Sequence, residues 1–446
     1  MNAPRVPRTL RLIDIVLLST VAIVNVNTVP PVARFGKVTF LLWIVAFLAF
    51  FVPEGVAVLV LSRRFPGEGG VYLWARRAFG DVHGFLSGWC YWTNNLFYVP
   101  VLLVYLAGVV AFAGGQQSAS LVDNKIFVAA IAFGWLLIIT VANIRGMGAG
   151  KWINNVGGIS TGVTVVLIGV AAAVARFKGA VNPVPLAEGS LLDMTGGLGV
   201  MCFAFIGIEL AATMSEEIQN PARDMPRAVL ITGAVALVSY LLVTDGLMAL
   251  VPAGELGAIQ GVMQGISRGA AAAGLEWLVG PIAVVMALSV AGAASAWFAG
   301  PARIPFVAGL DSALPPALGR VHPRWGSPYV SLATCAAVSA LLTAVSLFGS
   351  SVAEAYEVLL KATVVTNLVP FVYLFLALLT LDGIGPGGRV AGAAGLLVTL
   401  AGMTTGFVPS ADVESVGLFE TKMAVGVLGP LLLGLWLFWR SRRRVA

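Results

Sequence analysis

Long apolar stretches, each about the length of a membrane-spanning helix, follow one another along almost the whole chain. A bilayer core needs roughly 20 mostly apolar residues for each helical span. The stretches are continuous, whereas the strands of a transmembrane β-barrel alternate apolar and polar positions over about ten residues. The pattern therefore predicts an all-α integral membrane protein with twelve transmembrane helices. These lie near 11–34, 38–62, 82–113, 124–146, 152–177, 194–214, 226–251, 277–303, 328–349, 354–381, 389–408 and 421–440.

The composition agrees with a protein whose solvent is lipid. Hydrophobic residues make up 59% of the chain and charged residues 11%, whereas soluble domains carry about 25% charged residues. The 52 glycines favour close helix packing, which stabilises helix pairs in a bilayer. We therefore expect membrane lipid as a partner and a single transmembrane domain over 1–446, with no separate soluble domain.

The net charge of +6 is better explained by membrane topology than by nucleic-acid binding. With twelve spans both chain ends lie on one side, and most of the 27 Lys and Arg residues then lie on that side too. Short cytoplasmic loops are enriched in Lys and Arg. The pattern predicts cytoplasmic termini and a multi-pass protein of the cell inner (plasma) membrane.

The cysteines and histidines give no sign of a metal centre or a disulfide. Cys90, Cys202 and Cys335 lie in or beside apolar stretches and form no CxxC pair, and His83 and His322 lie near separate polar loops. We interpret the cysteines as small buried apolar residues. A metal-dependent membrane enzyme is therefore not expected, and no cofactor is predicted.

Span 1 contains polar residues in the middle of an apolar stretch. Asn25, Asn27 and Thr28 are followed by Pro30 and Pro31, and an Asn side chain can bond to nearby backbone in competition with the helix. Transporters often bind substrate where a helix is interrupted at the middle of the membrane, because the freed N–H and C=O groups become ligands. Span 1 is therefore a candidate broken helix.

Span 6 carries a matching feature. Gly207 lies in mid-span and Glu209 follows it. Spans 1 and 6 are five apart, as the first members of two five-helix repeats would be, and the odd number inverts the second repeat. Polar residues within one helix can serve only as contacts between helices, and that alternative stays open for each span alone. The two spans together favour a binding site.

Three stretches resemble the amino acid–polyamine–organocation (APC) superfamily. Residues 53–92 are similar to its span 2, cytoplasmic loop and span 3, and residues 295–328 to the end of span 8 and the loop after it. The most specific stretch is 203–228, where an F-x-G-x-E core precedes the tail EE-x-x-NP-x-R-x-x-P-R-A. Within the superfamily, residues 89–100 resemble glutamate/GABA-antiporter-type permeases.

The resemblance implies a LeuT-type fold with two inverted repeats, over 11–177 and 194–381, and two peripheral helices over 389–440. It implies alternating access, with the amino and carboxyl groups of an amino acid bound at the breaks in spans 1 and 6. The family motif in span 1 is G-[ST]-G, and this chain differs from it by carrying Asn25-Val26-Asn27. Backbone amides or Asn side chains would then contact the substrate. The implied substrate-binding positions in span 1 are Ile23, Val24, Asn25, Val26, Asn27 and Thr28.

The resemblance transfers more closely in span 6. Phe203 matches an aromatic lid over the substrate, and Ala204 and Ile206 match carbonyls that bind its amino group. Gly207 is the implied break and Glu209 a buried acid for coupling or gating. The remaining implied substrate-binding positions are Asn94 and Asn95 in span 3 and Ser295 and Trp297 in span 8.

Single ionisable residues at membrane depth are functional candidates, because burying a charge in a bilayer is unfavourable. Glu209 could relay a proton, lock the gate by hydrogen bonds or hold the broken helix. Glu54 is interpreted as a tie between helices, with proton movement as its alternative role. Lys361 is interpreted as a partner of Glu357 or as a snorkelling lysine near the outer end. Some sodium-independent members carry a lysine in span 5 in place of sodium, and Ser160 stands there in this chain.

Together these features predict a secondary active amino-acid transporter, either a permease or an exchanger, with no enzymatic activity. Its expected small-molecule substrate is an amino acid or an amine. Sodium coupling (Na+), proton coupling (H+) and obligatory exchange all stay open. The alternative is a polyamine or organic-amine transporter on the same fold, because the changed residues of span 1 suit a substrate without an α-carboxylate.

Overall fold

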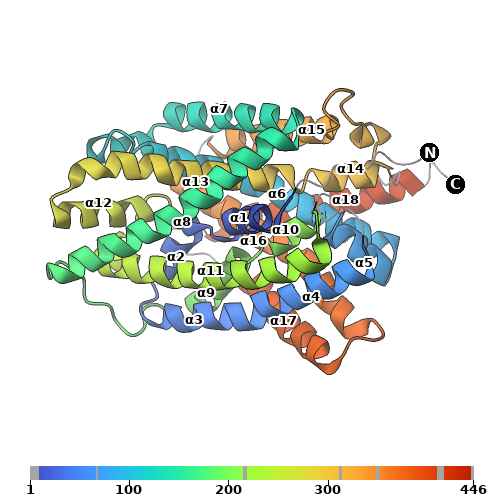
Figure 1. Cartoon of the computed structure of the whole chain (residues 1–446), viewed down its shortest axis with the longest axis horizontal. Coiled ribbons are helices and arrows are strands. Elements are labelled where there is room, and N and C mark those ends of the chain that lie inside the picture. The colour runs from blue at the N-terminus through green and yellow to red at the C-terminus, as the bar shows by residue number, and fades with distance from the viewer. Residues whose placement is uncertain are drawn as a thin grey trace.

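The computed structural model describes residues 10–66, 69–213, 218–310, 314–347, 352–408 and 416–442, which are helical apart from their connections and one isolated bridge between Leu10 and Ile218. Most of the long helices run along the longest axis of the molecule, and α5 (Val71–Phe79) lies at one end of it (Figure 1). The longer helices are α1 (Leu12–Ile23), α3 (Val38–Ala46), α4 (Val52–Arg64), α5 (Val71–Phe79), α6 (Asp81–Val110), α7 (Lys125–Ile144), α8 (Met147–Phe177), α9 (Leu191–Ala204), α11 (Pro221–Leu250), α12 (Gly261–Ala273), α13 (Val279–Ala299), α14 (Arg303–Leu310), α15 (Tyr329–Ser346), α16 (Val352–Thr380), α17 (Pro386–Thr405) and α18 (Val416–Arg442).

The described residues contain ten helices that are long and apolar enough to cross a membrane. The ninth predicted span is the shorter apolar helix Tyr329–Val345, and α17, which coincides with the eleventh, is not among the ten. The chain is therefore a multi-pass helical membrane protein. The count of twelve spans stays a prediction.

The helices differ in how deeply they are buried, and this separates the centre of the molecule from its lipid-facing rim. In the most apolar window of α6, 89% of the residues are buried, against 22% in α18. The helices of the rim expose large apolar side chains, for example Leu137 on α7 and Val166 on α8. Apolar surface of this kind is unfavourable in water and favourable against lipid tails.

A proline explains the joint inside the second span. Pro53 has no N–H to bond to the carbonyl four residues earlier, so a regular helix cannot continue through it unchanged. A π turn, η2 (Phe47–Phe51), fills the space between α3 and α4 directly before that proline. Short π segments of this kind commonly occur at functional positions, and Glu54 follows immediately.

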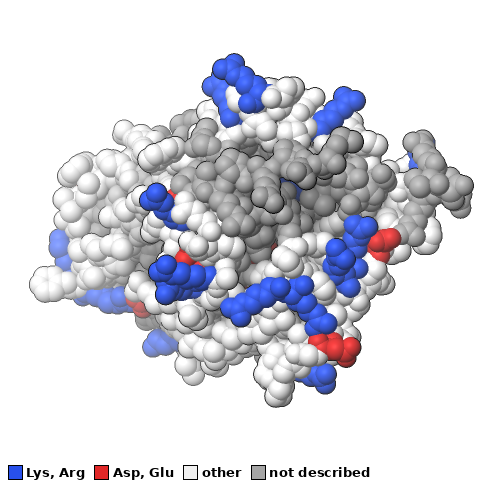
Figure 2. Space-filling view, turned by 45° about the vertical axis from the view of Figure 1, so that its right-hand side comes forward, with Lys and Arg blue, Asp and Glu red and all other residues white. Residues whose placement is uncertain are grey.

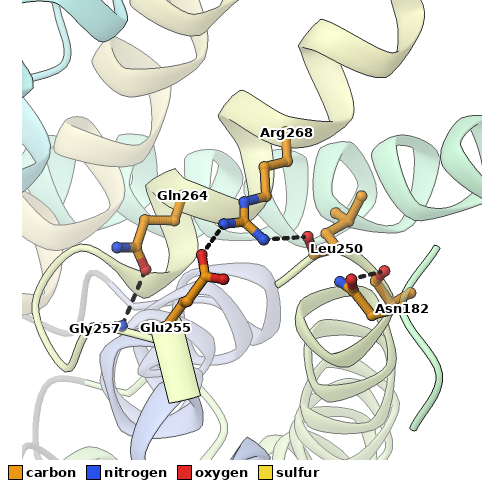
Figure 3. A network of polar contacts seen from close by, with 7 residues as sticks. Asn182, Leu250, Glu255, Gly257, Gln264 and Arg268 are labelled. Atoms are coloured by element: carbon orange, nitrogen blue, oxygen red, sulfur yellow. Dashed lines mark hydrogen bonds and ion pairs between the residues drawn. The ribbon is translucent and has the colours of Figure 1, made fainter. Parts of the chain in front are cut away.

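The connection between α11 and α12 lies at the end of the molecule opposite α5 (Figure 1). Arg268 of α12 donates to Glu255 and to the carbonyl of Leu250, and the N–H of Gly257 donates to the Gln264 carboxamide oxygen at 3.0 Å (Figure 3). Arg34 of the first span donates to the carbonyl of Leu256 at 2.6 Å. The first span is thus fastened to this connection, which the hydrophobic pattern alone did not predict.

Glycine allows α8 and α13 to approach closely. A Cβ at Gly157 would lie 2.6 Å from the Cα of Gly292, closer than real Cβ contacts. Each glycine removes the side chain that would hold the two backbones apart, as in many helix pairs within membranes.

We therefore predict that Gly157→Val lowers the free energy of unfolding by about 1–3 kcal/mol, because overpacking separates α8 from α13. Thermal unfolding in detergent measures this. The control is Gly162→Val on the same helix, where a Cβ meets no atom within 4 Å. Equal losses of stability in the two variants would contradict this account of the packing.

Candidate functional site

The first span is interrupted in the middle. After α1 ends at Ile23, Val24 and Asn25 leave the helical conformation, and a short turn η1 (Val26–Thr28) leads into α2 (Val29–Ala33). The Asn25 side chain donates to the carbonyl of Ala22 at 2.5 Å, and the Thr28 hydroxyl donates to the Asn25 carbonyl at 2.7 Å. These polar residues therefore satisfy backbone groups that the interruption frees.

The sixth span is interrupted at the predicted glycine. The helix α9 ends at Ala204, and α10 (Ile208–Thr213) begins after Gly207, whose φ is +148°. A Cβ at Gly207 would lie 2.8 Å from Cγ1 of Ile23. Only glycine fits here, because the backbone conformation excludes a side chain and the first span packs directly against this point.

A tyrosine of α11 joins the two interruptions. The Tyr240 hydroxyl accepts the N–H of Asn25 at 3.1 Å and lies within hydrogen-bonding distance of the carbonyls of Ala204, at 2.8 Å, and Ile23. A hydroxyl has one hydrogen to donate, so it bonds to one of these carbonyls at a time. The carbonyls of Ile23 and Ala204, both at positions that the resemblance assigns to substrate binding, thus compete for the Tyr240 hydroxyl hydrogen.

Aromatic packing holds Tyr240 in place. The Trp43 ring stacks on it with centroids 4.2 Å apart and planes 5° apart, and the indole N–H of Trp43 donates to Thr244 at 2.9 Å. Phe205 meets the Tyr240 ring edge-on at 5.3 Å. Sequence reasoning missed Tyr240, although a lone tyrosine amid the apolar residues of span 7 was a usable signal.

Of the two residues predicted in span 8, Trp297 reaches the first break from α13 and Ser295 does not. The Trp297 indole donates to the Ala22 carbonyl at 3.0 Å, and its ring meets the Tyr98 ring edge-on at 5.7 Å. Ser295 is buried and accepts from the Asn143 side chain of α7 at 3.4 Å. Trp297 therefore lies at the break, while Ser295 bonds to a neighbouring helix.

The aromatic residue predicted as a lid, Phe203, lies near the centre. Its ring meets the Tyr98 ring of α6 edge-on, with centroids 5.1 Å apart. From the first break, the Asn27 side chain donates to the Tyr356 hydroxyl of α16 at 3.1 Å. The two interruptions therefore face α6 and α16 through aromatic and polar side chains.

Several buried polar atoms between α6 and α16 have no hydrogen-bond partner among the described residues. Asn94 and Asn367 lack partners for both side-chain atoms, and Asn95 keeps a free oxygen although its nitrogen donates to the Tyr91 carbonyl at 2.7 Å. The other such atoms include the hydroxyls of Tyr98, Tyr105, Thr363 and Thr366. Buried polar groups are normally paired, so this polar seam is suited to ordered water or a polar ligand.

Helical register places both sides of the polar seam at one level. His83 of α6 lies 3.3 Å from the Tyr373 hydroxyl, and Tyr105 of α6 packs near Tyr356, so α6 and α16 run antiparallel. Asn94 lies midway between His83 and Tyr105, about three helical turns from each, and so faces α16 as they do. The α16 residues of the seam follow Tyr356 by two and three turns. Sequence reasoning found the α6 side and missed Thr363, Thr366 and Asn367.

Two glutamates meet beside the second break. Glu209 accepts the Tyr91 hydroxyl at 2.6 Å on one oxygen and the Gly207 N–H at 2.8 Å on the other. Glu54 of α4 faces the Glu209 carboxyl, and neither of its oxygens accepts a hydrogen bond from a described residue. Both side chains are fully buried. The two carboxyls therefore meet between α4 and α10, and the role of Glu54 as a tie between helices stays a prediction.

Lys361 takes part in a contact that the sequence did not indicate. Its ammonium donates to the Val408 carbonyl at 2.8 Å and lies 5.0 Å from the centre of the Phe419 ring. The Glu357 side chain, its expected partner, lies outside the described part of the structure.

Ser160 is buried on α8, and its carbonyl accepts the Thr164 hydroxyl at 2.9 Å.

Comparisons with known proteins identify the family of the chain. Residues 12–419 match the family described as amino acid permease. The chain belongs to that family. The predicted resemblance to the APC superfamily is thereby confirmed, while the likeness to glutamate/GABA antiporters stays a prediction.

Relatives of this permease differ in the substrates their names give. An uncharacterized transporter of Legionella pneumophila is 27% identical, and the match covers 97% of this permease and 96% of that protein. A probable agmatine/putrescine antiporter of Lactococcus lactis, AguD, is 27% identical over 64% of this permease and 61% of its own length. The branched-chain amino acid permease BcaP of Bacillus subtilis is 25% identical over 62% and 61%. This permease is therefore a transporter among amino-acid and polyamine carriers.

We predict that Tyr240→Phe weakens both interruptions of this permease, because two carbonyls and the Asn25 N–H share that hydroxyl. The expected loss is about 1–3 kcal/mol of unfolding free energy, the range for leaving buried polar groups unpaired. Thermal unfolding and substrate uptake in liposomes measure it. Tyr329→Phe on α15, which is remote from both breaks, is the matched control. If the two variants behave alike, Tyr240 does not join the breaks.

Proposed function

We propose that this permease is a secondary active transporter that carries an amino acid by alternating access, with the substrate bound where the first and sixth spans are interrupted. The observation that carries the proposal is the meeting of the two interruptions at one buried hydroxyl, that of Tyr240. Interrupted helices at mid-membrane commonly bind the polar groups of a substrate in transporters.

The backbone of the first break provides donors for a carboxylate. Among the described residues, the N–H groups of Val26 and Asn27 have no acceptor, as expected for the first residues of a helical turn. Such N–H groups favour an anion. In the proposed complex they bind the α-carboxylate, and the α-amino group bonds to carbonyls at the end of α9. Asn25 instead holds its own backbone, so its side chain shapes the break more than it contacts the substrate.

The arrangement supports a LeuT-type fold as the framework of this mechanism. The broken helices open the two segments, 11–177 and 194–381, that the sequence predicts as inverted repeats. α17 and α18 follow them, and α18 is largely exposed at the rim. Alternating access in such folds moves one group of helices against another around a fixed site. The bond from Arg34 to Leu256 would then have to break whenever the site opens toward the end of the molecule that carries α12.

The proposed location is the inner (plasma) membrane with both termini in the cytoplasm. The end of α18, the last described helix, and α5 lie at the same end of the molecule (Figure 1). Figure 2 turns that end toward the viewer and shows many Lys and Arg side chains and few acidic ones on the described part of this face. This distribution is typical of a cytoplasmic face.

The polar seam between α6 and α16 favours a substrate whose distal end forms hydrogen bonds. Asn94, Thr363 and Asn367 offer neutral donors and acceptors, which suit an amine, amide or hydroxyl better than a branched hydrocarbon. A carrier of organic amines is therefore the second candidate. Two relatives support it by name, AguD and the low-affinity putrescine importer PlaP of Escherichia coli, the latter 26% identical over 63% of this permease.

The direct test is uptake and exchange in liposomes with a labelled panel of polar amino acids, aliphatic amino acids and diamines. Uptake of amino acids that unlabelled amino acids inhibit is the expected result. Uptake of diamines alone would replace the first candidate with the second. If the purified, folded permease transports no compound of the panel, both candidates are wrong.

We predict that Asn367→Leu lowers uptake of polar substrates while the free energy of unfolding stays equal or rises. The variant removes a buried carboxamide that has no described partner, and an unpaired buried polar group is destabilising by about 1–3 kcal/mol. Asn143→Leu is the contrasting variant, because the Asn143 side chain is bonded to Ile139 and Ser295 and its loss should lower stability. Uptake by Asn367→Leu at the wild-type level would show that Asn367 of α16 does not bind the substrate.

A further inference from the structure

Glu54 and Glu209 form a carboxyl pair with unequal surroundings. Both side chains are 0% exposed. Glu209 has two protein donors, the Tyr91 hydroxyl at 2.6 Å and the Gly207 N–H at 2.8 Å. Glu54 faces the pair's other carboxyl and has no donor on either oxygen among the described residues. A carboxylate accepts hydrogen bonds and a protonated carboxyl also donates one, so the two residues are suited to different protonation states.

No described cation compensates the pair. The other titratable side chains that face it are Tyr91 of α6 and Cys202 of α9, both buried. No described lysine, arginine or histidine bonds to it, and no third side chain makes it a metal site within the described residues. Two adjacent carboxylates in a buried site repel each other and lack hydration, so they do not both ionise. A proton on Glu54 supplies the missing hydrogen bond, with Glu54 donating to the Glu209 carboxylate.

We propose that Glu54 and Glu209 share a single proton and that this proton is the ion coupled to transport. The inference rests on the proposed function and specifies its energy source. It also assigns Glu54 the second of the two roles that the sequence left open, that of a residue that carries a proton.

The pair is placed so that opening of the site acts on it. One donor to Glu209 is the N–H of Gly207, which is the second break itself, and the other is Tyr91 of α6. Glu54 lies on a different helix, α4, which packs against α10. Movement of α10 relative to α4 separates the two carboxyls and admits water. The pair takes up a proton while the site faces one side of the membrane and Glu54 releases it while the site faces the other, so one proton crosses with the substrate, and the emptied permease returns with the two carboxyls still apart.

The first break offers little room for a sodium ion instead. Its freed carbonyls are ready ligands for a cation, since a helix C-terminus carries partial negative charge. However, the Ala22 carbonyl accepts from both Asn25 and Trp297, and the Ile23 carbonyl lies beside the Tyr240 hydroxyl. Protein donors therefore occupy the oxygens at the end of α1. A proton gradient, not a sodium gradient, is the expected driving force.

The test uses the full-length permease in liposomes, with labelled substrate uptake and a trapped pH indicator followed together. Wild-type permease should move protons when substrate is added. A proton gradient of one pH unit should accumulate substrate up to about tenfold, since one pH unit is a tenfold ratio of proton concentration and one proton moves with each substrate. A sodium gradient should have no effect. Glu54→Gln should lose the substrate-driven proton movement, because a carboxamide donates to Glu209 permanently and carries no exchangeable charge.

Two further measurements separate this role from a structural one. Glu54→Gln should unfold at the wild-type temperature or above it, whereas Glu209→Gln should unfold lower because it disturbs the bonds from Tyr91 and Gly207. Asp245→Asn is the control acid, exposed on α11 and paired with Arg176 at 2.7 Å, and should keep proton movement. Infrared spectra of the purified permease at neutral pH should show a protonated carboxyl band that Glu54→Gln lacks.

Each result either supports or overturns the proposal. Absence of that infrared band from the wild-type spectrum overturns the shared proton, whether or not the permease transports anything in the liposome panel. Presence of the band together with substrate uptake that moves no protons overturns the coupling alone. If Glu54→Gln still moves protons in the same ratio to substrate as the wild-type permease, the coupling is also overturned. Absence of all transport by the wild-type permease overturns the proposed function itself, and the coupling with it.

Discussion

The need to pair backbone polar groups inside an apolar molecule determines the centre of this permease. A helix that stops at mid-membrane leaves N–H and C=O groups that neither lipid nor water can satisfy. Here the first and sixth spans stop at the same place, and Tyr240, Trp297, Asn25 and Glu209 occupy most of the freed groups. Among the described residues, the N–H groups of Val26 and Asn27 have no acceptor, which leaves donors for a substrate.

The surrounding packing follows from this constraint. Gly207 brings the two breaks into contact because it has no side chain, and Trp43 orients Tyr240 by stacking. The helices α6 and α16 enclose the breaks with polar residues that lack partners in this state. A site of this kind is stable when closed and gains hydrogen bonds when a polar substrate enters. The same contacts connect the site to the carboxyl pair, because one break supplies the N–H that holds Glu209.

The parts predicted correctly from sequence were those that a local pattern specifies. The helical class followed from continuous apolar stretches, and the second break followed from Gly207 within a family motif. The partners that complete the centre could not be found this way. Tyr240 lies far along the chain from Asn25, and only helix packing brings it there. Thr363 and Asn367 look like ordinary polar residues until register places them opposite Asn94. The sequence also does not show that Glu54 faces Glu209, because only the packing of α4 against α10 brings the two carboxyls together.

The most direct test of the central claim is an experimental structure of the permease with its transported substrate bound. The account predicts substrate between the two breaks, with an oxygen acceptor within about 3.5 Å of the N–H groups of Val26 and Asn27, the limit for a hydrogen bond. It also predicts that the distal end of the substrate replaces the missing partners of Asn94 and Asn367. A substrate bound away from both breaks, with the Tyr240 contacts unchanged, would contradict the account.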